Sequence, residues 1–127
     1  MSIPITNQIF KKALATAKKS TVLRSKMGAV LFTNSGEIVV FASNQTCLGH
    51  GKKFTIHAEE AVIAKAHKIK ANSRMKGRLS IFILRWTKTK GIRMAKPCER
   101  CAALLKKTGW NVFFTDYNGK IIKDGKP

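Results

Sequence analysis

Acidic residues are scarce in this sequence of 127 residues. Six Asp and Glu side chains stand against 25 Lys and Arg, which gives a formal net charge of +19 at pH 7. Such a chain is attracted to polyanions, and salt weakens that attraction. The charge therefore predicts nucleic acid or a nucleotide phosphate as the partner. The alternative explanation is basicity that serves only solubility or reflects a basic proteome.

Long apolar runs and a secretory leader are missing as well. No apolar stretch approaches the ~20 residues that a membrane-spanning helix needs. Met1 to Phe10 lack the basic-then-apolar order of a signal peptide. We therefore expect no membrane partner and a cytoplasmic protein, or one inside the host cell if the source is viral. Proline occurs at only three positions and no repeat or linker stands out, so we expect one domain over residues 1–127.

Cysteine occurs three times, an odd number. Two of the three lie close together, in the run Cys98-Glu99-Arg100-Cys101. In a reducing compartment this Cys-x-x-Cys spacing favours a metal or redox site over a structural disulfide.

Hydrophobic periodicity predicts helices and strands that alternate along the chain. Helices are predicted over about residues 6–19, 57–71 and 98–107. Strands are predicted over residues 28–32, 37–42, 79–86, 111–115 and 120–123, with loops over 44–56 and 87–96. Turn signals predict that the first two and the last two strands form hairpins. This order calls for a sheet with helices packed on it.

Two short motifs each open a predicted helix: His57-Ala58-Glu59 and Pro97-Cys98-Glu99-Arg100-Cys101. Zinc favours imidazole and thiolate ligands in a tetrahedron, and three protein ligands leave a position for water, as in catalytic zinc sites. We predict one zinc ion per chain, held by His57, Cys98 and Cys101. Cys47 and His50, on the loop before His57, stay open as a fourth ligand. His67 lies about 15 Å farther along the helix and cannot share the metal.

Glu59 is the predicted catalytic residue. In the first turn of a helix its carboxylate and the His57 ring can flank one pocket. A carboxylate beside a zinc-activated water can accept a proton and deliver it to a leaving amine. Because both motifs open helices, the ligands would also lie at the positive ends of two helix dipoles, which favour thiolates. Glu60 is expected to point elsewhere, as a solvated or ion-paired residue.

Together the two motifs form the signature of zinc-dependent deaminases. The chain resembles the CMP/dCMP-type cytidine deaminase superfamily from about Gly28 to Gly119, including the run Gly28-Ala29-Val30-Leu31. The resemblance implies a three-layer α/β/α fold with a mixed five-stranded sheet. It also implies that Asn44 contacts the sugar or base of the substrate and that the backbone near Ala58 and Pro97 orients the base. The alternative for Asn44 is a turn residue that closes the second strand.

Some departures from the superfamily pattern bear on the substrate. Free-nucleoside cytidine deaminases usually carry Cys at the position of His57, and a Glu near Asn44 that this chain lacks. dCMP deaminases often carry Asn at the position of Ala61. The turn signal at Tyr117-Asn118-Gly119 predicts an antiparallel last strand, whereas tRNA-acting and APOBEC-like members use a helix to bring in a parallel one. Some toxin-type DNA deaminases end in such a hairpin, so nucleic acid stays open.

Basic and aromatic side chains gather in the loops expected near the zinc. The cations would follow a phosphate backbone, and the aromatic rings would stack on bases. We predict nucleic-acid contacts from Arg24, Lys26, Lys52, Lys53, Phe54, Trp86, Lys88, Lys90, Arg93 and Tyr117. For Trp86 and Phe54, a role in covering the core explains the sequence equally well.

These observations predict zinc-dependent hydrolytic deamination of cytosine to uracil in single-stranded DNA or RNA. The alternatives are a deaminase of a free nucleotide or nucleoside such as dCMP or cytidine, and an adenine-directed tRNA deaminase. A basic nucleic-acid-binding protein whose zinc is structural is the alternative from another class. Cytosine is favoured over adenine by frequency within the superfamily and not by a residue. The sequence does not decide between DNA and RNA, or between a monomer and a homo-oligomer.

Overall fold

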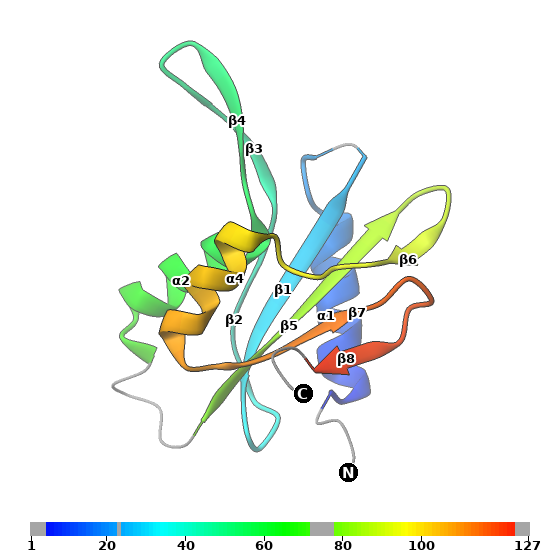
Figure 1. The fold of residues 1–127 in the computed structure, drawn as a ribbon, viewed down its shortest axis with the longest axis vertical. Coiled ribbons are helices and arrows are strands. Elements are labelled where there is room, and N and C mark those ends of the chain that lie inside the picture. Colours follow the sequence, from blue (N-terminus) through cyan, green and yellow to red (C-terminus); the bar gives the residue numbers. More distant parts are fainter. Residues whose placement is uncertain (1–4, 23, 72–77, 124–127) are drawn as a thin grey trace.

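A computed structural model describes residues 5–22, 24–71 and 78–123 of the chain. They form a mixed sheet with helices on both faces and a separate two-stranded hairpin (Figure 1). The strands of the main sheet are β1 (Lys26–Thr33), β2 (Ile38–Ser43), β5 (Leu79–Thr87), β6 (Gly91–Arg93), β7 (Asn111–Thr115) and β8 (Ile121–Lys123).

The strand order is β2-β1-β5-β7-β8, with β6 paired to the end of β5. β1 pairs antiparallel with both β2 and β5, β5 pairs parallel with β7, and β7 pairs antiparallel with β8. The predicted mixed five-stranded sheet and its final antiparallel hairpin are thus confirmed. The prediction of an uninterrupted loop over residues 87–96 is wrong, because β6 adds a sixth strand there. It is only three residues long, too short for a periodic pattern.

Helix α1 (Asn7–Lys18) covers one face of the sheet (Figure 1). The Thr6 hydroxyl caps it by accepting a hydrogen bond from the Ile9 N–H. Its backbone lies very close to β1, where a Cβ on Gly28 would be 2.4 Å from the Ala13 carbonyl oxygen. The fully buried side chains on this face include Ile9, Ala13, Ala17, Val30, Phe82 and Leu84.

Helices α2 (Ala58–Lys68) and α4 (Glu99–Thr108) cover the opposite face, which completes the three layers. Successive residues of β5 point alternately to the two faces, so Ile81 and Ile83 lie under α2 and α4. Gly109 ends α4 with a left-handed φ of 76°, a conformation that glycine adopts readily. Within the described residues, no helix has the length and apolarity needed to span a membrane.

The segment predicted as a loop over residues 44–56 is instead a hairpin, and that prediction is wrong. We call this hairpin the arm; it comprises β3 (Gln45–Gly49) and β4 (Lys52–Ile56). Its two-residue turn, His50-Gly51, has positive φ at both positions, 52° and 77°. That is the backbone of a type I′ turn, whose twist suits a hairpin. The sequence pattern does not predict the arm, because its strands are mostly polar and its turn is His-Gly, where Asn-Gly is the usual hairpin signal.

Candidate active site

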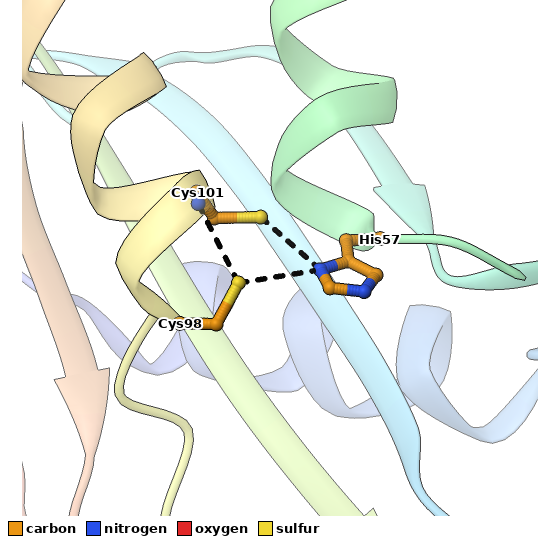
Figure 2. A group of neighbouring side chains, drawn as sticks. All are labelled: His57, Cys98 and Cys101. Atoms are coloured by element: carbon orange, nitrogen blue, oxygen red, sulfur yellow. Dashed lines mark hydrogen bonds between the residues drawn. The ribbon is translucent and has the colours of Figure 1, made fainter.

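The three predicted metal ligands meet where α2 and α4 begin. His57 is the N-cap of α2, Cys98 is the N-cap of α4, and Cys101 lies in the first turn of α4 (Figure 2). His57 Nδ1 is 3.1 Å from Cys101 Sγ and 3.8 Å from Cys98 Sγ. In tetrahedral zinc sites the N···S and S···S separations are about 3.6 and 3.8 Å. All three donor atoms lie within 4.8 Å of one another, so a single zinc ion can reach them with small side-chain adjustments.

The segment that leads into α4 is fixed to the neighbouring strand. The Ala95 N–H donates to the Thr115 carbonyl oxygen at 2.8 Å, and the Thr115 hydroxyl donates to the Arg93 carbonyl oxygen at 2.7 Å. Pro97 follows and is buried, which holds the chain extended just before the N-cap. The Cys101 N–H then points at Cys98 Sγ, 3.5 Å away. An N–H group of the first helical turn thus faces the sulfur of Cys98.

The chemistry of the donor set also fits a cation. Burial raises the pKa of the Cys101 thiol, and the negative charge of Glu59 raises it further. Cys101 is fully buried, so a thiolate there needs a positive charge close by. A divalent metal supplies that charge, and one imidazole with two thiolates is a zinc-type ligand set. The three clustered side chains of His57, Cys98 and Cys101 therefore have the composition of a zinc site.

Glu59 is buried beside this triad. Its side chain is 2% exposed, and among the described residues its Oε1 has no hydrogen-bond partner. Burial raises the pKa of the carboxyl, while its own backbone N–H and the nearby His57 act in the opposite direction. Buried polar atoms are nearly always paired, so an orphaned one calls for an explanation. The unpaired oxygen of Glu59 is thus available beside the candidate metal site.

Glu60 has a different task from Glu59. One oxygen accepts a hydrogen bond from the His57 N–H at 3.1 Å, and the other forms an ion pair with Arg100 in α4. Of the two alternatives predicted for Glu60, solvated or ion-paired, the ion pair is confirmed, although its carboxylate also contacts the backbone of His57. Sequence reasoning missed Arg100 as a residue of the site, because its partner lies 40 positions away in the chain.

The side chain of Asn44 is buried, and most of its hydrogen-bonding groups already have partners. Its Oδ1 accepts hydrogen bonds from the Ser20 hydroxyl at 2.5 Å and from the Met27 N–H at 2.8 Å. Its Nδ2 donates to the Ser25 carbonyl oxygen at 2.7 Å. Asn44 therefore ties the segment between α1 and β1 to the end of β2. These contacts account for a structural role and leave one amide hydrogen for any other contact.

Of the remaining candidate residues, two lie beside the triad and two lie away from it. Ala58 and Pro97 are buried at the two helix starts, beside the triad. Cys47 and His50, the candidate fourth ligands, lie on the arm. Over the ranges that the structure describes, the triad is the one cluster of three potential ligands, and neither joins it.

Five of the predicted nucleic-acid contacts line one hollow of about 460 Å³. We call it the basic hollow; these five are Arg24, Lys88, Lys90, Arg93 and Tyr117. It also contains Arg85, which the sequence analysis missed. Arg85 follows Ile81 and Ile83 on the face of β5 that carries α2 and α4, and its buried Nε has no hydrogen-bond partner among the described residues. A single cation inside an apolar strand was the available signal.

The other five contacts separate into two groups. Lys52, Lys53 and Phe54 lie on β4 of the arm and are exposed. Lys26 and Trp86 lie on the α1 face, away from the metal ligands. Lys26 Nζ donates to the Ser20 carbonyl oxygen, and the Trp86 ring packs against the α1 cluster below Lys18. The core-covering explanation therefore suits Trp86, whereas Phe54 is 47% exposed.

Comparisons with known proteins agree with this geometry. Residues 5–115 match the family described as the cytidine and deoxycytidylate deaminase zinc-binding region. A crystal structure of cytidine deaminase from Burkholderia pseudomallei superposes with a TM-score of 0.65 at 20% identity, over 94% of this chain and 92% of that chain. Cytidine deaminase from Mycobacterium leprae gives a TM-score of 0.59 at 20% identity, over 93% of each chain. Such identities show a shared fold. No curated protein sequence matches significantly.

Proposed function

The chain belongs to the cytidine and deoxycytidylate deaminase family, and from this premise we propose that it converts cytosine to uracil in single-stranded DNA or RNA. The supporting observation is a compact triad of zinc-type ligands beside a buried carboxylate, one oxygen of which has no hydrogen-bond partner among the described residues. We also propose that residues 1–127 form one deaminase domain. Among the described strands, all except the two of the arm belong to one sheet, and helices cover both faces of that sheet.

In this proposal His57, Cys98 and Cys101 would hold a zinc ion, which would make hydroxide available at neutral pH by lowering the pKa of water to about 7. Glu59 Oε1 would accept the proton of the attacking water. The same carboxyl then delivers the proton to the amino nitrogen of the base, so that ammonia leaves and a carbonyl oxygen takes its place. Water and cytosine are thus consumed, and uracil and ammonia are formed.

Neighbouring residues keep these groups in place. Glu60 joins the first turns of α2 and α4, which fixes Glu59 relative to the two cysteines. We assign the orientation of the base to the backbone at Ala58 and Pro97, which are buried at the two helix starts. Such positioning matters because proton transfer requires heavy atoms within about 3 Å of each other.

The basic hollow supports a polynucleotide substrate. It contains five cationic side chains and no acidic one. It lies at the end of the sheet where β5 finishes and where residues 94–97 lead into α4. A single nucleotide phosphate needs only one or two cations, whereas a strand presents a phosphate at every step. A free nucleoside stays the second candidate, because two solved structures with the same fold are cytidine deaminases.

The test is mass-resolved product analysis after incubation of the zinc-loaded protein with dCMP, cytidine, single-stranded DNA and single-stranded RNA. The proposal expects uracil in a polynucleotide, formed faster than from dCMP or cytidine. The matched control is zinc-loaded Glu59→Ala, which should form none. Product from dCMP or cytidine alone would refute the polynucleotide substrate, and product from adenine alone would refute the choice of base. A lack of product from every substrate would refute the deaminase itself.

A further inference from the structure

The arm is built for reach and not for packing. Among the described elements, β3 and β4 pack to any extent only against each other, and Figure 1 shows them standing away from the sheet. Thr21 holds the base of the arm. Its hydroxyl accepts a hydrogen bond from the Thr46 N–H at 2.8 Å and donates one to Gln45 Oε1 at 3.1 Å. A lone two-stranded hairpin is marginally stable in water, so this arm is suited to being ordered by a partner.

The pairing of the two strands decides which side chains share a face. Phe54 pairs with Cys47, and Lys52 pairs with Gly49, so Phe54 and Lys52 lie on one face. Leu48 pairs with Lys53 and lies on the other face. Each face thus offers one exposed apolar side chain next to one lysine, with Phe54 47% and Leu48 77% exposed.

Because Gly49 has no side chain, the Phe54 ring can lie directly against its backbone. A Cβ on Gly49 would lie 2.9 Å from the ring, so the ring rests over the backbone of the opposite strand. The ring is therefore supported on one side while nearly half of the side chain stays open to solvent. A supported, exposed ring next to a lysine is suited to stacking on a nucleobase beside a phosphate.

Charge selects the class of partner. The arm contains His50, Lys52 and Lys53 and no Asp or Glu. A second copy of this chain would bring another net charge of +19 toward it, and like charges at close range oppose such contact. A polyanion with flat apolar groups is complementary to both features.

The arm is also joined directly to the candidate active site. Asn44 immediately precedes β3, and the zinc ligand His57 immediately follows β4. A strand bound at Phe54 is therefore held at most about 10 Å of extended chain from His57.

We propose that the arm is a nucleic-acid-binding ribbon that grips the substrate strand beside the zinc site. Phe54 stacks on a base and Lys52, on the same face, contacts the phosphate beside it, while Lys53 contacts a phosphate of the same strand from the opposite face of the ribbon. The choice of a single strand rests on the proposed function. The arm thereby contributes affinity at a distance from the reacting base.

The experiment measures equilibrium binding and not turnover. Labelled mixed-sequence single-stranded DNA and RNA are titrated with zinc-loaded Glu59→Ala protein, with and without a second change in the arm. Phe54→Ala should weaken binding about 10-fold, and Phe54→Trp should restore it. Lys52→Gln with Lys53→Gln should reduce the slope of log affinity against log salt by about 1.4. The matched control, Lys106→Gln with Lys107→Gln in the last turn of α4, should change both quantities less.

Circular dichroism and zinc content show whether each variant is folded. Arm variants that are folded and bind like their parent would overturn the proposal, as would equally tight binding of a duplex, whose bases are not free to stack. A self-association that Leu48→Ser removes, with unchanged nucleic-acid binding, would show that the arm is a dimer contact and overturn it too. A protein that binds through the arm but deaminates nothing would refute the proposed function alone.

Discussion

Arg100, in the first turn of α4, forms an ion pair with Glu60, in the first turn of α2. The same carboxylate accepts a hydrogen bond from the backbone of the zinc ligand His57. One side chain therefore couples the two helices that supply the metal ligands. Arg100 is 71% exposed, and exposed ion pairs contribute at most about 1 kcal/mol to folding. We infer that this pair serves the geometry of the site more than the stability of the fold.

Arg100→Ala is expected to weaken zinc binding about 10-fold, because outer contacts orient the ligands. The free energy of unfolding of the zinc-free protein should fall by less than about 1 kcal/mol. Competition with a chelating dye measures the first quantity, and urea unfolding measures the second. Arg78→Ala, an exposed arginine before β5, is the control. A large loss of stability with unchanged zinc affinity would contradict this role.

Glu59→Gln should lower kcat by about 100-fold or more while zinc content stays near one per chain. The amide keeps the shape of the side chain but does not accept and return a proton. Steady-state kinetics and elemental analysis of the same preparation provide the two measurements. Turnover that survives the change would remove Glu59 from the reaction.

Zinc removal should lower the thermal stability of the protein. A metal that binds only the folded chain stabilises it by about 4 kcal/mol when its concentration is a thousand times Kd. Cys98→Ser should hold much less than one zinc per chain, and its Tm should no longer respond to a chelator. Cys47→Ser, a change on the arm, is the matched control and should keep the zinc. Full zinc occupancy in Cys98→Ser would exclude Cys98 as a ligand.

Arg85→Gln should raise KM for a single-stranded oligonucleotide about 10-fold and reduce the salt slope by about 0.7, because one phosphate contact is lost. The buried, unpaired Nε of Arg85 in the basic hollow is the reason for this choice. Arg78→Gln removes the same charge at the opposite end of β5 and should leave both values close to those of the parent protein. Equal effects of the two changes would reduce the role of Arg85 to general charge.

Gly28→Ala should destabilise the fold by about 1–3 kcal/mol through overpacking. The new Cβ would lie 2.4 Å from the Ala13 carbonyl oxygen and 2.7 Å from the Ala17 nitrogen, both in the backbone of α1. Helix and strand must then separate. Urea unfolding measures the change, with Ala15→Ser on the exposed side of α1 as the control. A neutral result would mean that α1 moves freely over β1.

Features that depend on local chemistry were predictable from the sequence. The start of α4 follows from Pro97 and Cys98, its end follows from Gly109, and β7 has the predicted bounds. Both faces of β5 are covered, so its side chains are buried without alternation, and the face of each one is known only once helices are assigned to the two faces. That is why the sequence left Trp86 between a base-stacking and a core role, which its place on the α1 face now explains.

Features that depend on contacts between distant segments were not predictable. Arg100 reads as an ordinary surface arginine until α4 is placed beside α2. The Asn44 side chain makes hydrogen bonds to backbone groups of Ser25 and Met27, which lie in a distant segment, so no local sequence pattern predicts these contacts. The arm was missed for a different reason, since its polar strands bury almost nothing and leave no hydrophobic period.

The parallel pairing of β5 with β7 bears on how the molecule assembles. In the hairpins β1–β2 and β7–β8 the paired strands are adjacent in the sequence, so they can pair early in folding. β5 and β7 meet only after the intervening crossover, which contains α4 with Cys98 and Cys101, has docked. We therefore expect a nearly finished chain to capture the metal, so that zinc slows unfolding far more than it speeds folding. Stopped-flow refolding with and without zinc would reveal that asymmetry.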